Sequence, residues 1–133
     1  MYSIDEIMDM LDWNQPPAVQ EKGRQLAKNI RYINVFLQPL GKNLWDNCAI
    51  ILSERSDEEL RPYLSDLLEW ILDRNWPGAS CIWGRLKQYA DNEWFNYMMS
   101  ESIREATALQ EEGWLNNLLE LAEERQADQR AVL

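Results

Sequence analysis

Histidine is absent from this chain of 133 residues, and cysteine occurs only twice, as Cys48 and Cys81. Without histidine there is no Ser-His-Asp or Cys-His catalytic group, and the commonest ligand of zinc and iron sites is missing. The two cysteines lie far apart in apolar stretches, which favours reduced, buried thiols over a disulfide. We therefore predict no metal and no cofactor, so that any chemistry would fall to carboxylates, lysine or tyrosine.

Glycine and proline are also scarce, with five of each, and no stretch alternates apolar and polar residues as a half-buried strand does. Apolar residues instead recur three and four positions apart, which is typical of amphipathic helices. The chain length suits one domain, and a hydrophobic content of 46% is enough for a full core. We predict an all-α protein with a single domain over residues 1–133.

Long apolar runs are missing as well. No stretch approaches the roughly 18 apolar residues that a membrane-spanning helix requires. The first residues, Met1 to Glu6, have neither the basic nor the apolar region of a signal peptide. These absences predict a cytoplasmic protein that has no membrane partner.

Positive charge is in deficit, because 13 lysines and arginines face 23 aspartates and glutamates, for a net charge of −10. Residues 1–50 carry five basic and six acidic side chains, whereas residues 51–133 carry eight and seventeen. An acidic surface repels phosphate backbones and anionic lipids, so we expect no nucleic-acid partner. The charge either serves solubility alone or steers the protein toward a basic partner.

Helix boundaries can be placed from capping residues. Ser3 with Glu6 and Ser56 with Glu59 form capping boxes, in which the serine and glutamate side chains each bond a backbone N–H. We expect the second box to open one long helix to about Leu72, with a tolerated proline early in it. The other predicted helices cover about 17–30, 33–37, 44–52, 77–90 with Asn75 as N-cap, 92–103, and 113–125, followed by a frayed polar tail at 126–133.

The chain contains an internal repeat, because its halves correspond when they are shifted by 61 positions. The identical pairs are Leu11 and Leu72, Asp12 and Asp73, Asn14 and Asn75, Pro16 and Pro77, Ala18 and Ala79, Gly23 and Gly84, and Arg24 and Arg85. Each copy ends a helix at Leu-Asp, turns through Asn and Pro, and starts a partner helix. The repeated glycine predicts a close helix–helix approach in both copies. Stacked pairs bury faces that a single pair leaves exposed, as in a helical solenoid. We predict two related units of antiparallel helix pairs, at about 3–53 and 57–125.

Residues 67–79 read Leu-Leu-Glu-Trp-Ile-Leu-Asp-Arg-Asn-Trp-Pro-Gly-Ala. This segment resembles the Leu-Leu-x-Trp-Leu-Gln-Asp-Met-Asn-Trp-Pro-x-Ala run of the DUF5071 group, a small bacterial family of HEAT-like proteins. Leu72 and Arg74 replace the usual Gln and Met. The resemblance implies a short HEAT-like α-α superhelix and brings no catalytic residue. Small acidic HEAT-like bacterial proteins also look like immunity proteins, which bind and neutralise a toxin.

Two groups of residues are candidates for binding a partner. Of the seven tryptophans, most are expected in the core, but Trp13 and Trp76 lie beside the turns and suit exposed anchors. The second group consists of glutamates of the last two helices, which form either a solvated face or an acidic docking surface for a basic protein. Its members are Glu101, Glu105, Glu112, Glu120, Glu123 and Glu124.

These features favour a protein–protein interaction module over an enzyme. Its most concrete form is an immunity-type inhibitor that holds a basic toxin by charge complementarity around aromatic anchors. One alternative is a carboxylate-based enzyme or small-ligand binder in the groove between the repeats, for which Glu69 and Asp73 have suitable four-residue spacing. A further alternative is a structural adaptor.

Overall fold

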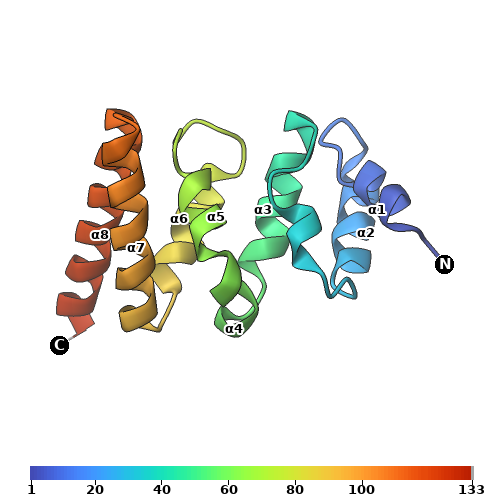
Figure 1. Ribbon diagram of the computed structural model, residues 1–133. Helices are drawn as coiled ribbons and strands as arrows, with labels where there is room; N and C mark the ends of the chain where they lie inside the picture. The colour runs from blue at the N-terminus through green and yellow to red at the C-terminus, as the bar shows by residue number, and fades with distance from the viewer. Residues whose placement is uncertain (133) are drawn as a thin grey trace.

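The computed structural model describes residues 1–132, and in this range it contains helices and turns but no strand (Figure 1). The elements are α1 (Ile4–Met10), α2 (Pro17–Ala27), the 3-10 helices η1 (Ile33–Phe36) and η2 (Lys42–Leu44), α3 (Trp45–Ser53), α4 (Asp57–Leu60), the 3-10 helix η3 (Arg61–Tyr63), α5 (Leu64–Trp70), α6 (Ala79–Gln88), α7 (Asn92–Ala108) and α8 (Glu112–Val132). The all-α prediction is confirmed.

The helices follow one another as stacked pairs, and the two chain ends lie at opposite ends of the stack (Figure 1). The helices α2, α3, α6 and α8 pack in that order, each against the next, while α1, η1, α5 and α7 cover them. The helix α5 packs against α7 on this second side. Each pair therefore buries apolar surface against its neighbours, which is the arrangement that the sequence repeat predicted.

Four connections gather along one edge of the stack, the upper edge in Figure 1. They are residues 11–16, 37–44, 71–78 and 109–111, and we refer to them together as the turn edge. The backbone N–H of Trp13 donates to the carbonyl oxygen of Asn43 at 3.0 Å, which joins the first two of these connections.

The repeated turn begins with the same hydrogen bond in both copies. The N–H of Asn14 donates to Asp12 Oδ1 at 2.8 Å, and the N–H of Asn75 donates to Asp73 Oδ1 at 2.9 Å. This short-range bond is the reason why Asp and Asn recur at this spacing. A later asparagine also closes each copy: Asn47 donates to the carbonyl of Leu11, and Asn117 donates to those of Ile71 and Leu72.

Both predicted capping boxes are present, at Ser3 and at Ser56. The long helix predicted after Ser56 is wrong, because α4 stops at Leu60 and a 3-10 turn separates it from α5. The cause is Pro62, which lies beyond the first turn. There its missing N–H and its ring are incompatible with continued α-helical bonding.

The predicted start of α6 is also wrong. Asn75 stays inside the turn, and the N-cap is Gly78, whose φ of 82° lies in the left-handed region. A Cβ at this position would lie 2.7 Å from Ala49 Cβ and 2.9 Å from the Trp45 carbonyl oxygen. The close approach in the second copy therefore occurs at Gly78.

The repeated glycine allows the expected close helix–helix approach in the first copy only. A Cβ at Gly23 would lie 2.8 Å from Met10 Cβ, so α1 and α2 do approach closely there. Gly84 is exposed on α6, and no atom lies within 4 Å of its would-be Cβ. The glycine is therefore repeated in the sequence, but the close packing around it is not repeated in the structure.

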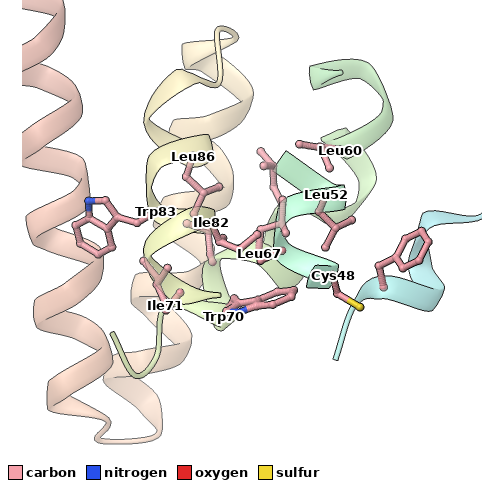
Figure 2. Close-up of a cluster of buried hydrophobic side chains, with 14 of the residues drawn as sticks. Cys48, Leu52, Leu60, Leu67, Trp70, Ile71, Ile82, Trp83 and Leu86 are labelled. Atoms are coloured by element: carbon pink, nitrogen blue, oxygen red, sulfur yellow. The ribbon is translucent and has the colours of Figure 1, made fainter. Parts of the chain in front are cut away.

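The core runs through the stack, and α3, α5 and α6 each contribute buried side chains to it. Figure 2 shows its centre, with Cys48, Leu52, Leu67, Trp70, Ile82 and Leu86. Both cysteines are free thiols, as expected. Cys48 is buried, which raises its pKa to about 12, whereas Cys81 is only half-buried, so the predicted burial is wrong there. Three of the seven tryptophans, Trp70, Trp83 and Trp114, are buried.

The tail beyond residue 125 was predicted to be frayed, but α8 continues through it to Val132. Two contacts hold it to earlier helices: Asp128 forms an ion pair with Lys87 at 3.1 Å, and Gln129 donates to Asn92 at 2.8 Å. Residue 133 lies outside the described residues. Among residues 1–132, no helix combines the length and apolar character needed to cross a membrane.

A tryptophan pocket at the turn edge

The candidate site is a cavity of about 280 Å³ between the 37–44 connection and the end of α5. Its walls combine indole rings, carboxylates and one leucine. The lining residues are Gln38, Trp45, Asp66, Glu69, Trp70, Leu72, Asp73 and Trp76. We call this cavity the tryptophan pocket.

The fold orients two of the rings through their ring N–H groups. Trp45, the first residue of α3, donates to the carbonyl oxygen of Pro39 at 3.0 Å. Trp70, the last residue of α5, donates to that of Pro77, also at 3.0 Å. Both acceptors belong to connections of the turn edge, so the turns and the rings are positioned together.

The three indoles meet edge to face. The ring centroids of Trp45 and Trp70 are 4.8 Å apart at 73°, and those of Trp45 and Trp76 are 5.5 Å apart at 84°. This is a preferred geometry for aromatic pairs. It sets neighbouring walls of the pocket nearly at right angles to each other.

Trp76 contributes two further features. The ammonium of Lys42 lies 5.0 Å from its ring centroid, which is a cation–π contact. Its ring N–H is buried and has no acceptor among the described residues. A buried donor without a partner costs about 1–3 kcal/mol. The packing of this ring and its contact with Lys42 have to offset that cost.

Three carboxylates give the pocket negative charge. Asp66, Glu69 and Asp73 line it, and none of them forms an ion pair within residues 1–132. Partial burial raises the pKa of Glu69, and the charges of Glu105 and Asp66 raise it further, against a hydrogen bond from Gln38. The site therefore favours an added positive charge.

Trp13 and Trp76, the two predicted anchors, lie in different places. Trp13 is 41% exposed on the 11–16 connection and does not line the pocket. Trp76 is half-buried and forms one wall. The sequence did not single out five of the lining residues, Gln38, Trp45, Asp66, Trp70 and Leu72. Asp66, Glu69 and Asp73 nevertheless share a spacing of three and four residues that could have indicated a common face.

The six predicted glutamates differ in their exposure and in their partners. Glu105 is exposed on α7 and close enough to raise the pKa of Glu69, and Glu101 beside it pairs with Arg104 at 3.4 Å. Glu112 and Glu123 are exposed on α8.

Glu120 and Glu124 are engaged in contacts between helices. Glu120 pairs with Arg74 at 3.1 Å, while Glu124 accepts from Trp83 Nε1 at 2.9 Å and pairs with Lys87 at 3.4 Å. Their charge therefore stabilises the packing of α8 and is less free to attract a partner.

The family model for DUF5071, a domain of unknown function, matches residues 40–132. The chain belongs to the DUF5071 family. The matched range contains every residue of the tryptophan pocket except Gln38, and it begins after α1, α2 and η1. No curated protein and no solved structure matches the chain. The DUF5071 assignment thus agrees with the resemblance of residues 67–79.

Proposed function

We propose that this DUF5071 protein is an interaction module that binds a basic protein at the tryptophan pocket. The observation that carries the proposal is the grouping of three unpaired carboxylates with three indoles in one cavity. Burial is the main cause of the raised pKa of Glu69, and a positive side chain from a partner would offset the repulsion by Glu105 and Asp66 that adds to it. The net charge of −10 would steer such a partner over longer distances.

Exposed apolar side chains on the turn edge support a protein partner in particular. Trp13, Leu72 and Leu109 are 41%, 41% and 60% exposed, and all three lie in the connections of that edge. Protein interfaces combine a few apolar or aromatic anchors with a polar rim. The pocket with its acidic lining and these neighbours would provide both.

The concrete form that we propose is an immunity-type inhibitor, in which the bound partner is a basic toxin. The acidic charge and the stacked helix pairs, which suit a HEAT-like superhelix, support it. Its test is co-expression with the product of the neighbouring gene. Co-purification and rescue of growth are expected, and the absence of both would end the toxin proposal.

The site itself is tested by two variants of equal charge. In the first, Asp66→Asn, Glu69→Gln and Asp73→Asn neutralise the pocket, while the amide oxygen introduced at position 73 can still accept the turn hydrogen bond. In the second, the exposed residues Glu21, Glu58 and Glu123 are changed to Gln. We expect the first variant to weaken binding of a lysine-rich peptide at least tenfold more than the second, measured by calorimetry. Equal losses would mean that overall charge, and not the pocket, holds the partner.

The same pocket favours one alternative, a small-ligand binder or carboxylate-based enzyme. Glu69, with its raised pKa, lies in one cavity with Asp66, and acid–base catalysis uses carboxyl pairs whose pKa values differ. Glu69 is exposed to solvent, however, which limits such a difference. Turnover of a bound small molecule that is lost in Glu69→Gln would favour this alternative.

A further inference from the structure

We infer that the tryptophan pocket receives the ammonium group of one lysine side chain of the partner, in preference to an arginine. This inference rests on the proposed function and specifies the chemistry of its central contact. It follows from the shape of the aromatic walls, the number of carboxylates, and a lysine of this chain that already contacts one ring.

The walls suit a compact cation. Because neighbouring indoles stand at 73° and 84° to each other, their electron-rich faces point in different directions, and they do not form a flat slot between parallel rings. A planar guanidinium binds best by lying flat on a single face. Two guanidinium groups of this chain each lie over a single indole ring, with Arg74 3.8 Å from the Trp83 centroid and Arg61 4.3 Å from that of Trp94.

The carboxylates also match an ammonium group. A lysine ammonium has three N–H donors that can turn toward separate acceptors, whereas the donors of arginine are fixed in one plane. Asp66, Glu69 and Asp73 line the cavity from successive turns of α5 and the connection that follows it, and none of them is paired within residues 1–132. They therefore offer three separate acceptors.

Lys42 provides a precedent within the molecule. Its ammonium lies 5.0 Å from the Trp76 centroid, so this ring already attracts an alkylammonium group. The pocket is also the right size for one side chain. At about 280 Å³ it lies just below the range of roughly 300–1,000 Å³ that is typical of sites for drug-sized molecules. The apolar stem of a lysine would contact the indoles and Leu72.

The inference is tested with the full-length protein by NMR, through the indole Nε1–H signals of the seven tryptophans. The probes are the Nα-acetyl amides of lysine, arginine and norleucine, together with choline. We expect the lysine probe to shift the signals of Trp45, Trp70 and Trp76 with a Kd on the order of 1 mM. Binding should be about threefold weaker for arginine and at least about tenfold weaker for neutral norleucine.

Variants locate the binding site. Trp76→Leu removes one wall and should weaken lysine binding about tenfold, whereas Tyr32→Leu, at an exposed aromatic residue outside the turn edge, should leave it unchanged. Because a change at Trp76 can disturb packing, Glu69→Gln serves as a second variant at an exposed position. We expect it to weaken the lysine probe severalfold without moving the signal of Trp94, whose ring N–H donates to the carbonyl oxygen of Arg61 outside the pocket.

Several outcomes would overturn the inference. Norleucine binding as well as lysine would show that charge plays no part, and tighter arginine binding would assign the pocket to a guanidinium. Choline binding more tightly than lysine would make the occupant a free small molecule. If the lysine probe fails while the peptide binding of the proposed function still depends on the pocket carboxylates, this inference falls and that proposal stands.

Discussion

At the scale of single residues, the ionised carboxylate of Glu69 serves the proposed function but lowers the stability of the folded protein. Its raised pKa means that the folded protein holds the proton more tightly than the unfolded chain, whose ordinary value is 4.5. The stability present below that value is therefore lost as pH rises through the raised pKa. We predict that Glu69→Gln is more stable than the wild type at pH 7 by up to about 0.5 kcal/mol. Urea unfolding at pH 4 and pH 7 checks this, because the difference should grow with pH.

Asp57 has a pKa shift in the opposite direction and therefore the opposite dependence of stability on pH. Burial would raise its pKa, but the N–H of Ala90 and the guanidinium of Arg85 lower it overall. Its contribution to stability is therefore present above the ordinary value of 3.8 and lost as pH falls through the lowered pKa. Asp57→Asn should destabilise the protein at pH 7 by about 1–3 kcal/mol, because Arg85 is buried and loses its charged partner. The same urea series should show this cost shrinking toward pH 3, and a constant cost would contradict the assignment.

Lys42 is predicted to oppose ligand binding at the pocket. A cation on Trp76 reduces the attraction of that ring for a second cation, whichever face the second one approaches. We expect Lys42→Gln to tighten binding of the lysine probe about two- to fivefold. The control is Lys22→Gln, which removes the same charge from above the Tyr2 ring. Equal effects of the two variants would show that the tighter binding comes from the change in net charge and not from the contact between Lys42 and Trp76.

At the scale of elements, the sequence predicted helices better than it predicted their joints. Capping boxes at Ser3 and Ser56 act through side chains three residues apart, so they are legible in the sequence and are present in the structure. The start of α6 depends on Gly78 meeting Ala49 and Trp45, which are about thirty residues away. No local pattern reports such a contact, and the repeat with the first copy pointed to Pro77 instead.

The two glycines of the second copy make that difference measurable. Gly78→Ala would force a side chain onto a φ of 82° and against Ala49, so we expect a loss of about 2–4 kcal/mol in the free energy of unfolding. Gly84→Ala lies in an exposed helical position with open space around it and should gain about 0.5–1 kcal/mol. Thermal unfolding of both variants checks the pair, and similar effects would contradict the close approach at Gly78.

At the scale of the whole molecule, the candidate site was harder to predict than the fold. The periodicity and the repeat indicated stacked helix pairs, because each copy carries its own apolar faces. The tryptophan pocket joins Trp45 to Trp70 and Trp76 across the boundary between the copies, and only the packing of α3 on α6 brings them together. The sequence suggested an acidic docking face on the last two helices, whereas ion pairs occupy Glu120 and Glu124 there.

The net charge of −10 leads to opposite salt effects on stability and on binding. Salt screens repulsion among the excess carboxylates, so the melting temperature should rise between low salt and about 0.5 M NaCl. The same screening weakens attraction for a basic partner, so its affinity should fall over that range, mainly through a slower association rate. In the variant with Asp66, Glu69 and Asp73 neutralised, the salt dependence of binding should be much reduced, while the Glu21, Glu58 and Glu123 control should largely keep it. Calorimetric melting tests the predicted rise in melting temperature, and stopped-flow binding tests the predicted fall in affinity. An affinity that does not change with salt would mean that apolar contacts of the turn edge, and not charge, hold the partner.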